Sequence, residues 1–252
     1  MADDVPAALE AYLEAIYGME EDGVPAIRAR LAERVGHSRP TVTEMVRRLV
    51  AEGYVEGRGR SLAFTSEGRR RAESVVRKHR LAERLLTDVI GLGWDKAHRE
   101  ADRWEHVISD DVEARLVALL GDPTTCPHGN PIPGSAATSR GLRPLALAAT
   151  GQTVRVERVV EALELDATTL SWLGAHGLKP GAVAHVRERA PDGTLALDVH
   201  GEIVAISPRI AALVHVGEDQ REPQRGHGGH SAAVPIRGGG DARREPASLA
   251  QS

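Results

Sequence analysis

The feature that most constrains the fold is a series of three short amphipathic helices followed by two short strands near the N-terminus. Apolar residues recur at helical spacing from about Pro6 to Glu20, from Pro25 to Gly36, and from the N-cap candidate Ser38 to Gly53. Tyr54–Val55 and Leu62–Phe64 are the strand candidates. This order predicts a helix-turn-helix completed by a β-hairpin, which is the winged-helix fold.

The predicted hairpin turn and its surroundings are basic. The turn Glu56-Gly57-Arg58-Gly59-Arg60 has two glycines that permit positive φ and two arginines that can lie along a phosphate backbone. From Arg28 to Arg71 there are 11 arginines and 5 glutamates, a local charge of +6 in a chain of net charge −4. A basic winged helix indicates DNA binding, although an arginine-rich, solvated surface would carry the same charge.

The helix that begins after Ser38 is the expected reading helix. In a winged helix, the N-terminal residues of this helix enter the major groove, whereas Arg47 and Arg48 lie further along and are expected at phosphates. Any one of these side chains alone is better explained as a solvated helix surface, and the prediction rests on the ordered set. The candidates for contact with double-stranded DNA are Arg28, Ser38, Arg39, Pro40, Thr41, Thr43, Glu44, Arg47, Arg48, Arg58 and Arg60.

Side chains that bind metals are concentrated on the next two predicted helices, from about Ser66 to Ile90 and from about Trp94 to Leu120. A spacing of three or four residues places such side chains on one helical face. Mixed imidazole and carboxylate donors suit Mn(II), Fe(II), Co(II), Ni(II) or Zn(II) better than Ca(II), although such pairs are also common as surface contacts. The ligand candidates are His79, Glu83, His98, Asp102, Glu105 and His106.

The last third of the chain predicts a small β-barrel and a polar tail. Four segments alternate or cluster apolar residues over strand lengths, with a short helix from Thr168 to His176 between them. The expected strands are Thr153–Val156, Ala182–Arg187, Leu195–Val199 and Glu202–Ile206. The expected domains are 1–74 for DNA binding, 75–140 for metal binding and dimerisation, 141–151 as a linker, 152–217 as the barrel, and 218–252 as a disordered tail.

Composition favours a cytoplasmic protein. A length of 252 residues with 41% hydrophobic residues allows more than one core, and the single cysteine, Cys126, excludes an internal disulfide. No apolar run has the length needed to span a bilayer, so no membrane association is expected. The acidic start MADDVP lacks the basic region of a signal peptide.

Four motifs in collinear order resemble the diphtheria toxin repressor family of metal-dependent regulators. They are RARLAER at Arg28–Arg34, RKHRLAERLL at Arg77–Leu86, RWEHVISD at Arg103–Asp110 and CPHGNPIPG at Cys126–Gly134. The resemblance implies a mainly α fold with a small β part: an N-terminal winged helix, a helical metal-binding and dimerisation domain, and a C-terminal SH3-like barrel. It also implies a homodimeric repressor with two metal sites per subunit, bound by Fe(II) or Mn(II).

The resemblance also assigns the ligand candidates to two sites. His79, Glu83 and His98 match the family's ancillary site, and Asp102, Glu105 and His106 match its primary site.

Three departures from the family pattern bear on these sites. Asp102 stands where iron-responsive members have a cysteine, which favours harder ions such as Mn(II) or makes Fe(II) binding less selective. Ala11 stands where a ligand from helix 1 is usual; Glu10 is the candidate replacement, although neighbouring helical residues point about 100° apart. A water is the second alternative and a degraded site the third. In the C-terminal module Thr169 replaces an amide side chain, while Asp166 keeps the acidic position and is either a further ligand or a helix N-cap.

The resemblance therefore predicts a repressor of metal-homeostasis genes that binds a palindromic operator when Fe(II) or Mn(II) is plentiful. Two other classes remain open. A metal-indifferent winged-helix regulator would follow from a degraded primary site. A metal-dependent hydrolase would use the same ligand types, but the sequence has no nucleophile motif and no phosphate-binding glycine loop.

Overall fold

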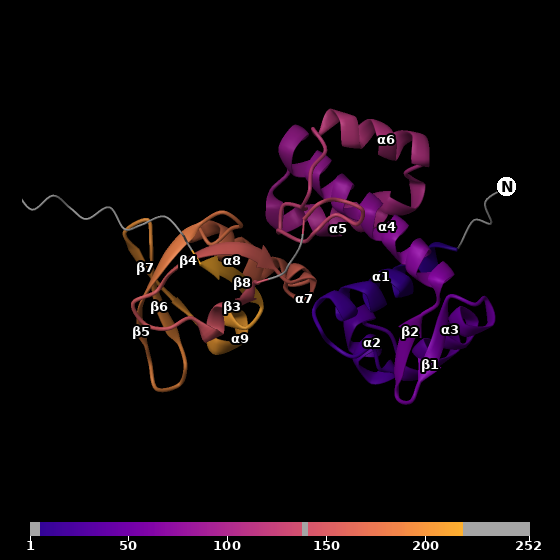
Figure 1. Ribbon diagram of the computed structural model, residues 1–252, viewed down its shortest axis with the longest axis horizontal. Helices are drawn as coiled ribbons and strands as arrows, with labels where there is room; N and C mark the ends of the chain where they lie inside the picture. Colours follow the sequence, from indigo (N-terminus) through magenta and orange to yellow (C-terminus); the bar gives the residue numbers. More distant parts are fainter. Residues whose placement is uncertain (1–5, 138–140, 219–252) are drawn as a thin grey trace, which may run out of the picture. The chain divides into compact units, whose positions relative to one another are not determined.

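The computed structural model describes residues 6–137 and 141–218. Its N-terminal part is a three-helix unit with a β-hairpin, as the sequence predicts (Figure 1). The Ser38 hydroxyl accepts a hydrogen bond from the Thr41 N–H at 3.3 Å and begins the third helix, and Gly36, at φ 67°, ends the second. The elements are α1 Ala7–Glu21, α2 Arg28–Val35, α3 Arg39–Ala51, β1 Val55–Arg58 and β2 Ser61–Phe64.

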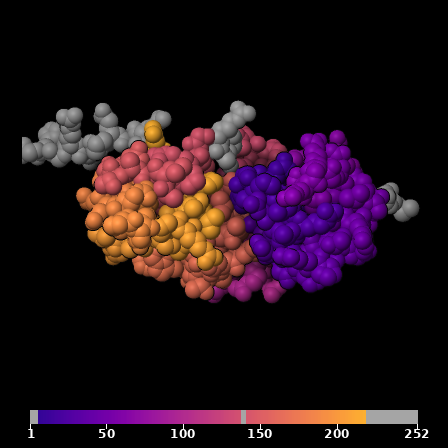
Figure 2. Space-filling model, turned by 90° about the horizontal axis from the view of Figure 1, so that it is seen from below, coloured from indigo at the N-terminus to yellow at the C-terminus, as the bar shows by residue number. Residues whose placement is uncertain are grey.

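The second helix begins later than the sequence suggests. Ile27 has an extended backbone and is the N-cap, so α2 starts at Arg28 and not at Pro25. One apolar core holds the unit together, and Leu13, Leu31 and Leu49 in it are fully buried. Each such side chain stabilises the folded state by about 1.5–3 kcal/mol. The surface of this unit is drawn in indigo and violet in Figure 2.

The middle of the chain is helical, but the predicted helix from Trp94 to Leu120 is two helices. The chain tightens into a 3₁₀ turn at Glu105–Val107, and Ile108 is extended before Ser109 caps the next helix. The predicted continuous helix therefore ends at Trp104, and Glu105 still lies with Asp102 in one group of possible metal ligands. The elements are α4 Ser66–Arg84, a π-helical turn at Leu85–Val89, α5 Trp94–Trp104, the 3₁₀ turn Glu105–Val107, and α6 Asp110–Leu119.

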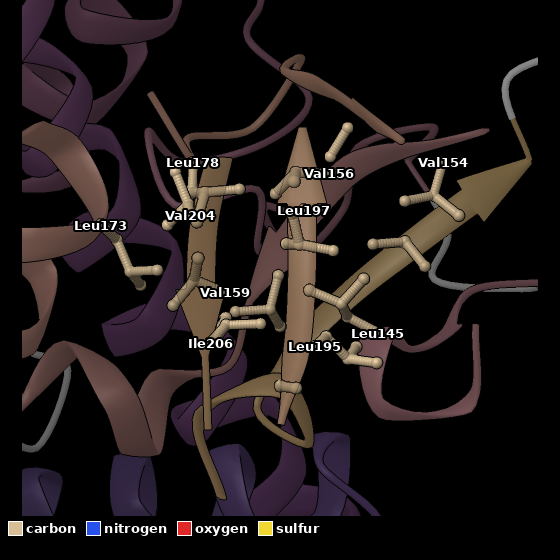
Figure 3. Close-up of a cluster of buried hydrophobic side chains, with 14 of the residues drawn as sticks. Leu145, Val154, Val156, Val159, Leu173, Leu178, Leu195, Leu197, Val204 and Ile206 are labelled. Atoms are coloured by element: carbon tan, nitrogen blue, oxygen red, sulfur yellow. The ribbon is translucent and has the colours of Figure 1, made fainter. Parts of the chain in front are cut away.

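The C-terminal part is an antiparallel six-stranded sheet in the order β3-β8-β4-β5-β6-β7. Its alternating apolar side chains face one core, in which Val156, Leu197 and Ile206 are fully buried (Figure 3). The strands are β3 Arg143–Pro144, β4 Thr153–Val159, β5 Val183–Arg189, β6 Leu195–Val199, β7 Glu202–Ile206 and β8 Val214–Glu218, with the 3₁₀ turn Leu145–Leu147 and the helices α7 Glu161–Glu164, α8 Ala167–Ala175 and α9 Pro208–Ala211.

The segment 141–151, expected to be a linker, contributes to this sheet domain. Strand β3 pairs with β8, and the side chains of Leu145 and Ala148 are fully buried in the core. Its proline and two glycines are typical of a linker, but apolar side chains of this segment pack in the core of the sheet domain. The predicted disordered tail lies, except for Glu218, outside the described residues.

Buried ion pairs connect α7 to the N-terminal helices. Glu161 Oε1 lies 2.7 Å from Arg34 Nη2, and Glu161 Oε2 lies 3.6 Å from Arg80 Nη2. Arg80 in turn binds both carboxylate oxygens of Glu21, at 3.0 and 2.8 Å. Gly18 packs so closely that a Cβ there would lie 2.7 Å from the Glu161 carboxylate. Side chains from α2, α4 and α7, which are distant in the sequence, therefore meet around the Glu161 carboxylate.

In the described parts of the chain, no helix has both the length and the apolar character needed to cross a membrane.

Candidate functional site

The imidazole of His79 on α4 lies between two groups of side chains that can bind metals. The side chain is buried, with 3% of its surface exposed. Its Nδ1 lies 2.6 Å from Glu105 Oε2 and 3.2 Å from Glu14 Oε1. Its Nε2 lies 3.0 Å from His98 Nδ1 and 3.3 Å from Glu83 Oε1. The two ring nitrogens therefore face two different clusters.

The nitrogen-rich cluster comprises three imidazoles and two carboxylates, those of His79, His98, His128, Glu83 and Glu164. Glu83 Oε1 lies 3.3 Å from His79 Nε2, 3.2 Å from His98 Nδ1 and 3.3 Å from His128 Nδ1. Glu164 Oε2, from α7, lies 3.1 Å from the Nδ1 atoms of both His98 and His128. All five side chains are buried.

Charge pairing holds the nitrogen-rich cluster together when no cation is bound. Burial lowers the pKa of His98, but the hydrogen bonds that His98 donates to Glu164 and Glu83 outweigh burial and raise that pKa to about 10. Burial raises the pKa of Glu164, but the neighbouring His128 and His98 outweigh it and lower that pKa to about 2. The other oxygen of Glu83, Oε2, is buried without a hydrogen-bond partner among the described residues. An unpartnered buried carboxylate oxygen fits a cluster that binds a cation.

The oxygen-rich cluster comprises Glu14 from α1, Asp102 from α5 and Glu105 from the 3₁₀ turn, around His79 Nδ1. One ligand atom of each of these four residues lies within 4.8 Å of those of the others. Burial, and then the charge of Glu105, raise the pKa of Glu14 well above its ordinary value. Three carboxylates around one imidazole leave an excess of negative charge, which a divalent cation would neutralise.

His106 and Glu10 adjoin the oxygen-rich cluster. His106 Nδ1 lies 2.7 Å from Glu10 Oε2, and its Nε2 lies 3.3 Å from Glu105 Oε1. Glu10, the candidate replacement for the helix-1 ligand, thus contacts His106 but is not among the four residues whose ligand atoms meet in the oxygen-rich cluster. Glu10 and Glu14 are four residues apart on α1 and share the face that meets α4 and the 3₁₀ turn.

Ala11 lines a cavity of about 530 Å³ together with Glu14, Asp102, Glu105 and His106. The position where the family pattern has a ligand on helix 1 thus borders the oxygen-rich cluster and provides only a methyl group. Glu14, one turn further along the same helix, brings a carboxylate there instead.

Asp166 is a helix cap and is not close to either cluster. Its side chain is exposed, and its Oδ1 accepts a hydrogen bond from the Thr169 N–H at 3.0 Å at the start of α8. Of its two sequence interpretations, the structure therefore supports the N-cap. Two residues earlier, Glu164 provides the carboxylate from the C-terminal part.

Four ligand-type residues near the clusters were missing from the sequence prediction, and three of them had a signal. Glu14 lies three residues after Ala11, the helical spacing that returns to the same face. Cys126 and His128 stand inside the quoted motif CPHGNPIPG. Glu164 had no spacing rule to single it out, because its segment meets the other ligand residues only in the folded chain.

The predicted DNA-contact residues lie on the accessible surface of α2, α3 and the hairpin. Thr43 is half-buried and its hydroxyl donates to the Arg39 carbonyl at 2.9 Å; the other ten are exposed. Arg47 and Glu44 pair at 3.4 Å, with side chains 74% and 64% exposed. Such an exposed pair contributes about 0–1 kcal/mol, so either side chain can exchange its partner for DNA at little cost.

Three family models match the chain in order. Residues 4–61 match the iron-dependent repressor N-terminal DNA-binding domain, residues 65–134 match the iron-dependent repressor metal-binding and dimerisation domain, and residues 143–217 match the FeoA domain. The C-terminal sheet is therefore an SH3-like domain of FeoA type.

The chain aligns with named relatives over nearly the whole length of those relatives. The chain is 42% identical over 229 residues to the iron-dependent repressor IdeR of Mycobacterium leprae, which covers 85% of this chain and 98% of the relative. It is 40% identical over 225 residues to the diphtheria toxin repressor of Corynebacterium diphtheriae, covering 85% and 99%. A solved manganese-dependent transcriptional repressor in complex with manganese superposes with a TM-score of 0.76 at 31% identity, covering 83% and 99%.

Proposed function

This chain belongs to the iron-dependent repressor family, and we propose that it represses metal-homeostasis genes when Fe(II) or Mn(II) binds. Its relatives are metal-dependent, DNA-binding transcriptional repressors, so it is a DNA-binding regulator and not the hydrolase that its ligand types alone would allow. The observation that carries the proposal is the meeting of Glu14 from α1 with Asp102 and Glu105 around one nitrogen of His79.

The oxygen-rich cluster would hold the ion that controls DNA binding, with Glu14, Asp102 and Glu105 as carboxylate ligands and His106, positioned by Glu10, beside them. This donor set fits Mn(II) or Fe(II), because hard oxygen donors predominate. The nitrogen-rich cluster would hold a second ion through His79, Glu83 and His98. A bound divalent ion would supply positive charge that balances the negative charge of the carboxylates.

The residues of the two clusters explain how an ion could control the winged helix. Without a cation, burial and the charge of Glu105 disfavour the ionised form of Glu14, and this cost favours movement of α1 away from α4 and α5. With that charge neutralised, α1 stays against α4, and α2 and α3 are held with it. If only one placement of α3 fits DNA, DNA affinity rises with metal binding, and metal affinity rises equally with DNA binding.

We expect two copies to bind one palindromic operator. The chain has a dimerisation domain, and α6 exposes apolar side chains, including Val112 at 47% and Leu119 at 63%. A two-fold axis through such a face would repeat the reading helix in successive major grooves. The expected place of action is the cytoplasm, where the chromosome of a bacterium lies.

The test measures DNA affinity by fluorescence anisotropy under anaerobic conditions, with excess chelator and with added Mn(II) or Fe(II). Wild type should bind operator DNA at least tenfold more tightly with metal. Glu105→Gln and His106→Ala should lose this stimulation while the helical circular dichroism spectrum stays unchanged. Glu73→Gln is the matched control, because Glu73 is an exposed carboxylate on α4 outside both clusters.

Equal DNA affinity with chelator and with metal would instead support a metal-indifferent regulator. In that case Glu105→Gln would leave DNA binding unchanged. Arg39→Ala and Arg58→Ala should weaken DNA binding under either outcome, because we propose that both side chains contact the duplex directly.

A further inference from the structure

The turn that follows α6 brings a thiol and an imidazole beside the nitrogen-rich cluster. The Cys126 N–H donates to the Asn130 carbonyl at 2.9 Å, and the Gly129 N–H donates to the Cys126 carbonyl at 3.0 Å, so the turn is closed. The side chains of Cys126 and His128 are buried, with 1% and 0% exposed. No ligand role was assigned to either residue from the sequence.

The turn is fixed against β4, which sets the place of His128. The Val159 N–H donates to the His128 carbonyl at 2.8 Å. Gly129 has φ 87°, and a Cβ at this position would lie 1.9 Å from the Glu157 carbonyl oxygen. Only glycine allows the turn to pack this closely on β4. In this position of the turn, His128 Nδ1 lies 3.1 Å from Glu164 Oε2.

The hydrogen bond of His128 leaves a defined nitrogen for a ligand. His128 Nε2 lies 2.9 Å from the Trp94 carbonyl oxygen, to which only a protonated nitrogen can bond. Nε2 therefore donates, and Nδ1 faces Glu83 Oε1 at 3.3 Å and Cys126 Sγ at 4.0 Å. Ligating histidines in metalloproteins are commonly oriented in this way, with the second ring nitrogen donating to a carbonyl or carboxylate.

The distances suit one shared ion. Zn–S and Zn–N bonds are about 2.3 and 2.0 Å, so a sulfur and a nitrogen 4.0 Å apart can bind the same ion. Single ligand atoms of Glu83, Cys126 and His128 all lie within 4.8 Å of one another. The buried Oε2 of Glu83, without a partner among the described residues, is an independent sign that this carboxylate has a missing ligand.

We propose that Cys126, His128, Glu83 and Glu164 form a metal site for a divalent ion of borderline softness, Zn(II), Co(II) or Fe(II). Cys126 Sγ would bind as a thiolate, releasing its proton to solvent, and His128 would bind through Nδ1. Thiolate and imidazole donors select against Mn(II), whereas the oxygen-rich cluster does not. This site differs in chemical preference from the oxygen-rich cluster, and it shares Glu83 with the ligand group His79, Glu83 and His98.

The test uses Co(II) as a spectroscopic probe with the full-length, reduced, metal-free protein and no DNA. A thiolate ligand gives a strong near-ultraviolet charge-transfer band, and the only cysteine of the chain is Cys126. We expect this band in wild type and its loss in Cys126→Ser. Zn(II) should abolish the band at stoichiometric amounts, and Mn(II) should leave it in place at a hundredfold excess.

His128→Gln tests the imidazole, since glutamine can still donate to the Trp94 carbonyl but provides no ring nitrogen. It should weaken Co(II) binding at this site at least tenfold, while Asp102→Asn, in the oxygen-rich cluster, should leave the band intact. Cobalt bound by wild type without the band, or a band that persists in Cys126→Ser, would overturn the proposal. Because no DNA is present, failure of the metal-switched repressor proposal would not change this result.

Discussion

At the scale of single residues, His79 has the most constrained role. Its two nitrogens contact different clusters, with Glu105 Oε2 at 2.6 Å from Nδ1 and His98 Nδ1 at 3.0 Å from Nε2. A side chain with a single ligand atom could contact only one of the two clusters. The imidazole ring therefore couples the clusters through a rigid path a few ångströms long.

Substitution His79→Gln should weaken metal binding at both clusters, whereas His98→Gln should weaken it at the nitrogen-rich cluster alone. We expect at least a tenfold loss of affinity for each affected site, about 1.4 kcal/mol or more. Calorimetric titration with Mn(II) and with Zn(II) measures the two sites separately. Equal losses at both sites in His98→Gln would contradict the separate roles of the two nitrogens.

The metal-free protein should become less stable as pH rises toward 10. The pKa of His98 is about 10 in the folded chain against an ordinary 6.5, so the folded state binds this proton more tightly than the unfolded state. This contribution is complete below about pH 6.5 and is lost as pH rises through about 10. Urea midpoints at pH 7, 8 and 9 with chelator measure it. His98→Gln should flatten the dependence, and an unchanged slope in that variant would exclude His98 as its source.

At the scale of elements, the short helix α7 connects two networks. Glu161 pairs with Arg34 at 2.7 Å, and Glu164, three residues later on the same face, contacts His98 and His128 at 3.1 Å. The carboxylate that contacts the nitrogen-rich cluster is therefore one helical turn from the carboxylate that contacts the helix-turn-helix. Through α7, the SH3-like domain therefore contacts both the DNA-binding domain, at Arg34, and the helical metal-binding domain, at His98.

Glu161→Gln should lower the free energy of unfolding by about 3–5 kcal/mol, because it leaves Arg34 and Arg80 partly unpaired in a buried setting. Chemical denaturation followed by circular dichroism measures the loss. Glu188→Gln, an exposed carboxylate on β5, is the control and should change stability by less than about 0.5 kcal/mol. A loss no larger than the control's would mean that solvent reaches the Glu161 cluster freely.

At the scale of the whole molecule, dimerisation should depend on the apolar surface of α6. Val112→Asp and Leu119→Asp each place a charge on this surface, and we expect monomers at micromolar concentration by analytical ultracentrifugation. Operator affinity should fall with the loss of the second reading helix. Ile203→Asp is the control, since Ile203 is 64% exposed on β7 and should leave the dimer intact.

Many of the helices and strands were predictable because they have a local signal, such as the Ser38 cap or the alternation in Leu195–Val199. The strands β3 and β8 and the short helices α7 and α9 were not predicted. The division of α5 and α6 was not predictable, since the apolar pattern continues through the 3₁₀ turn at Glu105–Val107. The clusters were predictable only in part. Spacing along one helix identifies His79 with Glu83, but Glu164 and His128 approach them through the packing of the turn after α6 on β4.

The position of Glu161 and Glu164 on one short helix has a consequence for variation among related sequences. A residue inserted or deleted between Val159 and Glu161 would rotate the helix by about 100° and turn both carboxylates from their partners in a single step. Length changes should therefore be tolerated in the hairpin turn at Pro191-Asp192-Gly193, where no cluster depends on register, and be rejected at the β4–α7 junction.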